Sequence, residues 1–155
     1  MRCEGDKIVI KVMVSTIIDA PLPTVWSIVS NFNGLPNWHP AVGKSQIDDG
    51  KSNNEIGCVR NLFMADDSGV VRETLLAQSD VDHEITYNMI GGPLPFVDYV
   101  AVMHFQSLTD GDKTFARWTA EYAVSDGQED HWREFVATDV FLGGFRALED
   151  AAKQA

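Results

Sequence analysis

Apolar and polar residues alternate along most of this chain with a period of two, the pattern of strands that bury one face. The first such segment, Ile8–Ile18, is rich in β-branched residues and is predicted to form a long strand. Turn-forming sequences such as Asp49-Gly50 separate the later segments, so successive strands are expected to pair antiparallel. Six further strands are predicted: Ala41–Asp48, Gly57–Met64, Val70–Gln78, Glu84–Ile90, Tyr99–Leu108 and Thr114–Val124.

The pattern changes to helical spacing at two places. After the first strand, apolar residues recur on one side of a short helix that has Pro23 in its first turn. A second helical turn, Leu35 to His39, is expected to end before Pro40. Near the end of the chain, Glu129 to Lys153 is predicted to form one long helix with an apolar side.

This order of elements belongs to the α+β class. A seven-stranded curved antiparallel sheet has one apolar face to cover, and only the C-terminal helix is long enough to cover it. A sheet wrapped around a single helix leaves space between the two layers, which is a natural place for a ligand. Because the chain has 155 residues and no linker or repeat, residues 1–155 are expected to form a single ligand-binding domain.

Composition narrows the range of partners. The formal net charge of −11 argues against nucleic acid or an anionic membrane surface. No segment is long enough to insert into a bilayer, and the acidic start of the chain is unlike a secretory signal, so a cytoplasmic location is expected. Cys3 and Cys58 have no metal or redox spacing and are interpreted as reduced thiols. A monomer and a homodimer are both compatible with the sequence.

Several motifs in a fixed order resemble the START-like polyketide cyclase/dehydrase and lipid-transport (SRPBCC) superfamily. The resemblance covers essentially the whole chain and implies the helix-grip fold, in which the sheet wraps around the C-terminal helix and encloses a hydrophobic cavity. Two short helices after the first strand belong to the same pattern. The motifs are Asp19-Ala20-Pro21 with Val25-Trp26, Trp38-His39-Pro40, Gly57-Cys58-Val59-Arg60, Arg72-Glu73-Thr74-Leu75, residues 85–92, Asp98-Tyr99 and Trp118.

The third to sixth strands are also similar to plant abscisic-acid receptors. In those receptors, loops at the positions of Asp66–Val70 and Gly91–Phe96 act as a gate and a latch over the cavity. The receptors hold the hormone's carboxylate with a lysine just after the second short helix, whereas this chain has no lysine there before Lys44. The gate's proline-bearing core is replaced as well. The resemblance therefore implies a cavity rather than hormone sensing.

The resemblance places Glu73 inside the cavity, and strand alternation then predicts which side chains share its face. Arg60 would lie on the neighbouring strand, facing the same enclosed space. The two could anchor a polar group of a ligand, or they could form a structural ion pair. The full set of predicted ligand-binding residues is Trp38, Arg60, Leu62, Glu73, Tyr87, Met89, Tyr99, Met103, Trp118, Phe135 and Asp139.

Three functions fit these residues. The favoured interpretation is binding or transport of a small hydrophobic molecule that is lipid-, polyketide- or terpenoid-like. The alternative is a cyclase or dehydratase, in which Glu73, Asp139 or His39 moves a proton while Arg60 or Tyr99 polarises a carbonyl. A protein-interaction domain with a filled pocket is the third. The chain has no nucleophile elbow, nucleotide loop or metal-ligand set, so neither a cofactor nor a metal is expected.

Overall fold

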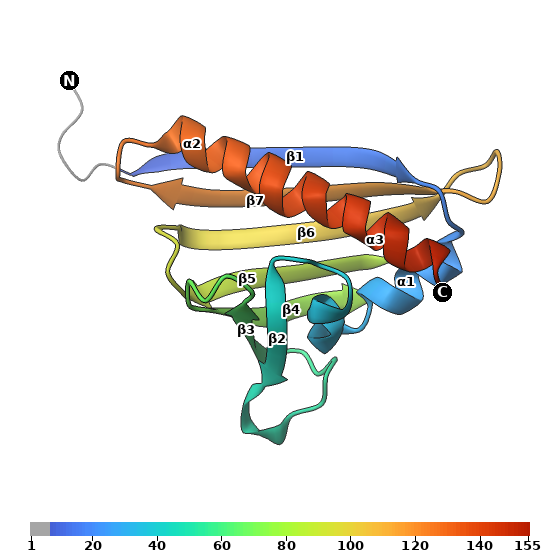
Figure 1. Ribbon diagram of the computed structural model, residues 1–155, viewed down its shortest axis with the longest axis horizontal. Coiled ribbons are helices and arrows are strands. Elements are labelled where there is room, and N and C mark those ends of the chain that lie inside the picture. The colour runs from blue at the N-terminus through green and yellow to red at the C-terminus, as the bar shows by residue number, and fades with distance from the viewer. Residues whose placement is uncertain (1–6) are drawn as a thin grey trace.

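The computed structural model describes residues 7–155, and Cys3 lies outside them. Seven strands form one antiparallel sheet in the order β1-β7-β6-β5-β4-β3-β2 (Figure 1). Each strand therefore pairs with its neighbour in sequence, except that β1 closes against β7. The strands are β1 (Ile8–Ile18), β2 (Val42–Ile47), β3 (Val59–Met64), β4 (Val70–Ser79), β5 (Glu84–Gly91), β6 (Val97–Ser107) and β7 (Thr114–Val124).

The helical elements lie on one face of the sheet. After β1 come the α-helix α1 (Leu22–Val29) and the 3₁₀ helix η1 (Phe32–Asn37), and a short 3₁₀ turn, η2 (Asp48–Gly50), follows β2. The C-terminal helix crosses the sheet diagonally (Figure 1) and consists of α2 (Glu129–Glu134), η3 (Phe135–Leu142) and α3 (Gly143–Lys153). The predicted α+β class and helix-grip arrangement are confirmed.

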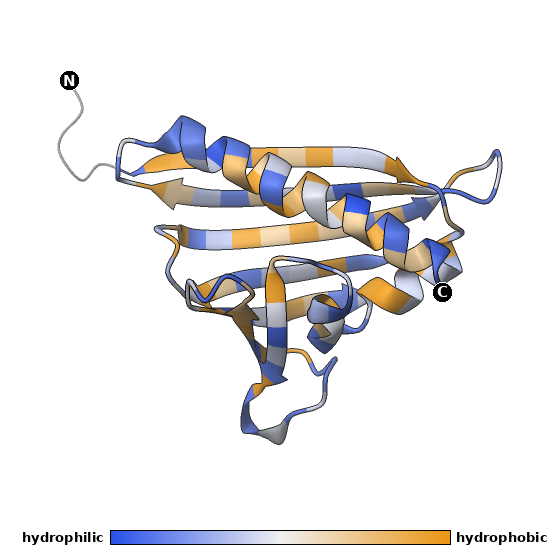
Figure 2. Ribbon diagram, viewed as in Figure 1, coloured by the Kyte–Doolittle hydropathy of each residue, from blue (hydrophilic) through white to orange (hydrophobic). Residues whose placement is uncertain are grey.

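The sheet bends where the pairing of β4 with β5 is irregular. The register shifts twice, between Arg72 and Glu73 and again between Leu75 and Ala77. Such bulges bend a strand and increase its twist. After the second shift the alternation of burial is lost, since Leu76 and Ala77 are both exposed. The bulges help this half of the sheet curve toward the helix. Figure 2 shows hydrophobic and hydrophilic residues following one another along the strands.

The middle of the C-terminal helix is a π-helix rather than the regular α-helix that the sequence predicted. A π-helix has hydrogen bonds from residue i to i+5, so each turn holds more residues than an α-turn. The buried residues Val136 and Phe141 are accordingly five positions apart. The expectation that Asp139 faces the cavity is wrong, because this wider turn leaves Asp139 on the exposed side.

The helix approaches the sheet most closely at Gly144. A Cβ atom there would lie 2.9 Å from Cδ2 of His39 and 3.0 Å from Cζ3 of Trp118. Trp118 in turn stacks on Phe141, with ring centroids 4.3 Å apart and planes 11° from parallel. The absence of a side chain at Gly144 therefore lets the helix rest directly on the indole ring that forms the floor of the site.

We predict opposite effects for alanine at the two adjacent glycines. Gly144→Ala should lower the free energy of unfolding by about 1–3 kcal/mol, because the new methyl group overlaps two rings that are themselves packed. At Gly143 the nearest atom to a Cβ is the Thr138 carbonyl oxygen, at 3.4 Å. Gly143→Ala should therefore be neutral or stabilising by up to about 1 kcal/mol through helix propensity. Urea unfolding of both variants checks this; equal stabilisation by both would contradict the proposed close approach.

Candidate functional site

A cavity of about 110 Å³ lies between the sheet and η3. Strands β3 to β7 supply its floor and one wall, and the helix supplies the opposite wall. Most of the residues predicted to bind a ligand do line it: Arg60, Leu62, Glu73, Tyr87, Met89, Tyr99, Trp118 and Phe135. Trp38 and Met103 instead border a much smaller adjoining space, which Trp118 also lines. Asp139 lines neither.

Apart from His39, the remaining lining is apolar. Most of it comes from helices and loops, where strand alternation does not predict which side chains point inward. Val136 and Val140 come from η3, and Leu94 and Phe96 come from the β5–β6 loop. His39, which was considered as a catalytic candidate, also lies in the wall. Leu94 and Phe96 lie in a loop, where strand alternation predicts nothing, so only the folded chain places them in the wall.

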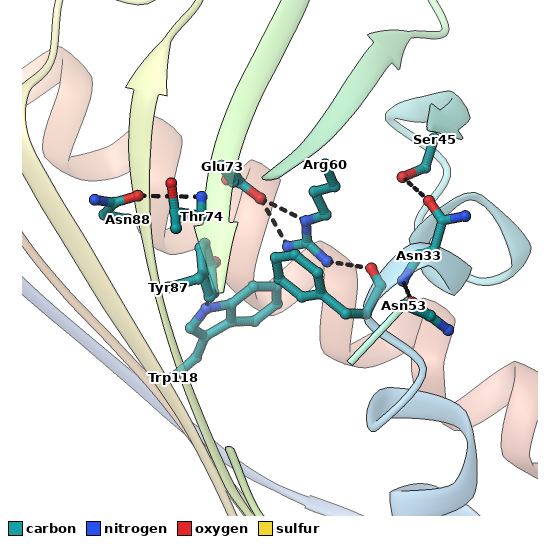
Figure 3. Close-up of polar contacts among 10 residues, drawn as sticks. Asn33, Ser45, Asn53, Arg60, Glu73, Thr74, Tyr87, Asn88 and Trp118 are labelled. Atoms are coloured by element: carbon teal, nitrogen blue, oxygen red, sulfur yellow. Dashed lines mark hydrogen bonds and ion pairs between the residues drawn. The ribbon is translucent and has the colours of Figure 1, made fainter. Parts of the chain in front are cut away.

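The polar centre of the cavity is an ion pair between Arg60 and Glu73. The two residues lie directly opposite each other on β3 and β4, and both are almost fully buried. Nε and Nη2 of Arg60 donate to the same Glu73 oxygen, Oε1, at 2.9 and 2.7 Å (Figure 3). Two charge-assisted bonds in one plane fix the guanidinium firmly on the carboxylate.

The first short helices complete the surroundings of the guanidinium. Nη1 of Arg60 donates to the carbonyl oxygen of Phe32 at 2.6 Å, which ties β3 to the start of η1. Cζ of Arg60 also lies 3.9 Å from the Phe32 ring centroid and 5.2 Å from that of Tyr87. Aromatic faces attract a desolvated cation, so these contacts partly replace the water that burial removes.

The Glu73 carboxyl is buried, and its two oxygens have different surroundings. Burial raises its pKa above the ordinary glutamate value, and the nearby Arg60 guanidinium only partly opposes that shift. Both bonds from Arg60 go to Oε1, and within residues 7–155 no hydrogen bond reaches Oε2. One carboxylate oxygen is therefore left to accept a hydrogen bond from a molecule in the cavity.

Two buried tyrosines lie beside this carboxylate. Burial raises the pKa of Tyr87 and Tyr99 well above that of a free phenol, and the negative charge of Glu73 raises both further. Nε1 of Trp118 donates to the Tyr87 hydroxyl oxygen at 3.0 Å (Figure 3). Both phenols therefore remain protonated at physiological pH and can act as hydrogen-bond donors.

His39 has both ring nitrogens engaged by the backbone. Nε2 lies 2.9 Å from the carbonyl oxygen of Val140 in η3, and the Ala41 amide donates to Nδ1 at 3.2 Å. These partners assign the proton to Nε2 and leave no free lone pair. Burial lowers the pKa of His39, so the ring is neutral. His39 joins the entry to β2 to the helix, and a proton-transfer role would require one of these bonds to break.

The loops at the expected gate and latch positions touch each other. A Cβ on Gly69, in the β3–β4 loop, would lie 3.2 Å from Cγ of Pro93 in the β5–β6 loop. On the other side, Phe96 stacks on Tyr99 with ring centroids 5.8 Å apart. The β5–β6 loop thus covers the cavity and continues its aromatic lining. Whether these loops open stays a prediction.

Among the described residues, no three histidine, cysteine, aspartate or glutamate side chains come together in a way that could hold a metal ion. In the same part of the chain, no helix combines the length and apolar character needed to cross a bilayer.

The family model for polyketide cyclase / dehydrase and lipid transport matches residues 9–153. The chain belongs to this family. The superfamily expected from the sequence motifs is thereby confirmed, and the match extends from β1 to the last turn of α3. No curated protein matches the chain.

Solved structures repeat the fold at low sequence identity. The protein XoxI from Bacillus cereus is 21% identical, with a TM-score of 0.81 over 92% of this chain and 95% of its own. A Nitrosospira multiformis protein is 27% identical, with a TM-score of 0.71 and 92% coverage of each chain. Norcoclaurine synthase from Thalictrum flavum, solved with dopamine and hydroxybenzaldehyde, is 15% identical, with a TM-score of 0.74 over 96% of this chain and 88% of its own.

We predict that removing the two partners of the buried ion pair has unequal effects on stability. Glu73→Gln should cost about 3–5 kcal/mol of unfolding free energy because it leaves a buried guanidinium without its counter-charge. Arg60→Met should cost less, since the pKa of Glu73 is already raised and its carboxyl can take up a proton. The double variant Arg60→Met/Glu73→Leu should regain most of the loss.

The exposed ion pair between Arg72 and Asp48, 2.8 Å long, provides the matched control. Arg72→Met should change stability far less than Glu73→Gln, because surface pairs are screened by water. Chemical denaturation of the four variants measures the set. Additive losses in the double variant would show that the two buried charges do not depend on each other.

The lowered pKa of His39 predicts a pH dependence of stability. The folded state keeps the ring neutral, whereas an unfolded histidine takes up a proton near its ordinary pKa of 6.5. The contribution of His39 is therefore fully present above that pH and is lost as pH falls toward the folded-state pKa. As the pH is lowered below 6.5, the midpoint temperature of thermal unfolding should fall more steeply in the wild type than in His39→Gln. Parallel pH profiles for the two proteins would contradict this.

Proposed function

We propose that the protein binds a small, uncharged amphipathic molecule in the inner cavity. Its apolar body would pack between Trp118 and the η3 side chains Val136 and Val140, which line the cavity together. Its polar group would donate a hydrogen bond to Oε2 of Glu73 and accept one from the hydroxyl of Tyr87, whose oxygen already accepts from Trp118 and Tyr99. The observation that carries the proposal is an apolar cavity with an unused acceptor oxygen at its polar end.

The charge balance of the cavity favours an uncharged ligand. Among residues 7–155, Arg60 is the only cation in its wall, and it already bonds Glu73 and the Phe32 carbonyl. A carboxylate ligand would meet the negative charge of Glu73 without a free counter-charge, and burying an unpaired charge is costly. An amine would meet the Arg60 guanidinium. A hydroxyl or another neutral donor avoids both penalties.

Cavity size restricts the inner part of the ligand to about one ring. An engineered protein cavity of about 150 Å³ binds benzene, and this cavity is somewhat smaller, at about 110 Å³. Its wall includes Met64 and Met89, which are only half-buried. Methionine side chains adapt readily to a neighbour's shape, so a single ring requires only side-chain movement.

A cyclase or dehydratase is the second candidate, supported by one observation. The pKa of Glu73 is raised toward the range in which a carboxyl serves as a general acid or base, and the carboxyl lies inside the cavity. Conversion of a molecule bound in the cavity by the wild type, and its loss in folded Glu73→Gln protein that still binds the molecule, would favour this activity over binding alone.

Native purification followed by mass spectrometry of a solvent extract tests the proposal. Val140→Phe should fill the cavity, because Val140 lines it, and Val102→Phe adds the same bulk on a half-buried residue outside it. The wild type and Val102→Phe should release a stoichiometric neutral small molecule, and Val140→Phe should not. An equal yield from all three proteins would place the molecule elsewhere.

Titration calorimetry with two matched probes tests the charge preference, including in protein that is purified empty. At pH 7.5, benzyl alcohol should bind at least about tenfold tighter than benzoate, a difference of about 1.4 kcal/mol. Binding of both probes should disappear in Val140→Phe. Tighter binding of benzoate would mean that Arg60 is available to a ligand, and it would overturn the uncharged-ligand proposal.

A further inference from the structure

A second pocket of about 260 Å³ lies directly outside the inner cavity. The β3–β4 loop, the β5–β6 loop and the start of η3 enclose it, with Pro40 and Pro93 on its rim. Five of its wall residues are also wall residues of the inner cavity: Ala41, Met64, Val71, Leu94 and Phe135. The two spaces are therefore neighbouring chambers separated by one layer of side chains.

Phe135 is the largest side chain of this layer and its only aromatic one. It is the first residue of η3 and is half-buried, and its ring packs edge-on against Trp132 with centroids 5.5 Å apart. Met64 and Leu94 beside it are also half-buried. These three of the five side chains in the layer are partly exposed, so they can move aside without any change in the backbone of the sheet.

We propose that the two chambers bind one elongated, neutral amphiphile, and that Phe135 sets the length of ligand the protein accepts. This inference rests on the proposed function of the inner cavity. The head group, of about one ring, occupies the inner chamber with its hydroxyl at Glu73. An apolar chain passes Phe135 and lies in the outer chamber between the two loops.

Volume and chemistry both support a shared ligand. Ligand sites commonly measure about 300–1,000 Å³; neither chamber reaches that size alone, and the two together do. Most of the outer wall is apolar and includes Pro40, Met64, Pro93 and Leu94, which suit an alkyl chain. The polar residues of this chamber are Asp66 and Ser68, so an anionic tail would be repelled.

A homologous series of 4-alkylphenols, from phenol to 4-octylphenol, tests the inference by titration calorimetry. Each methylene group that enters the outer chamber should tighten binding by up to about fourfold, equivalent to about 0.8 kcal/mol. The gain should begin with the first carbons that pass Phe135 and stop when the outer chamber is full.

Two variants act on different chambers. Phe135→Ala removes the largest side chain between the chambers. It should tighten the binding of 4-octylphenol by at least about tenfold and change the binding of phenol by less than about threefold. Ser68→Trp fills the outer chamber from an exposed position and should weaken only the long members, by a similar factor. Phe63→Ala is the matched control, because Phe63 is a half-buried phenylalanine of β3 that lines neither chamber.

The series separates failure of this inference from failure of the proposed function. If phenol binds but longer chains bring no gain, or if Ser68→Trp leaves 4-octylphenol unaffected, the outer chamber is not a subsite and only this inference falls. If no member of the series binds, the inner cavity is not a site for neutral amphiphiles, and both proposals fall. If Phe135→Ala and Phe63→Ala change the affinity for 4-octylphenol equally, Phe135 does not set the length of the ligand.

Discussion

The buried pairing of Arg60 with Glu73 is the constraint around which the rest of the site is arranged. Two charges in an apolar interior are tolerated only when each bonds the other and the remaining polar atoms are satisfied. Strands β3 and β4 provide the first condition by placing the residues opposite each other. The 3₁₀ helix η1 helps to meet the second through the carbonyl of Phe32. The same pairing cancels the positive charge of Arg60 and leaves one carboxylate oxygen for a ligand.

Much of this arrangement could be predicted from sequence because it depends on strand periodicity. Once one inward residue of a strand is known, alternation gives the others, so Arg60, Tyr87, Tyr99 and Trp118 were placed correctly in the cavity wall. The strand boundaries were predicted to within a few residues for the same reason. Pairing between β3 and β4 then followed from their adjacency along the chain.

What could not be predicted depends on local departures from regular geometry. A period of 3.6 residues puts Asp139 on the side of Val136, but the π-helical turn rotates it to the exposed side. No residue type in that segment announces a π-helix. The two backbone partners of His39 come from positions 41 and 140, and only the folded chain brings them together. Cavity volume is likewise a property of packing, which sequence spacing does not contain.

The wide turn of η3 also affects how this chain should be compared with its relatives. A π-helical segment holds more residues per turn than the α-helices on either side of it. Residues after the segment therefore occupy positions in space that earlier residue numbers would occupy in a regular α-helix. Residue-by-residue alignment with a relative whose helix is regular would therefore slip by one position somewhere between 135 and 142. Two residues that such an alignment pairs as a substitution would in fact occupy different positions in the two structures. Among proteins that share this fold at low sequence identity, a one-residue insertion or deletion in this helix is a way to reshape a pocket while every strand stays unchanged.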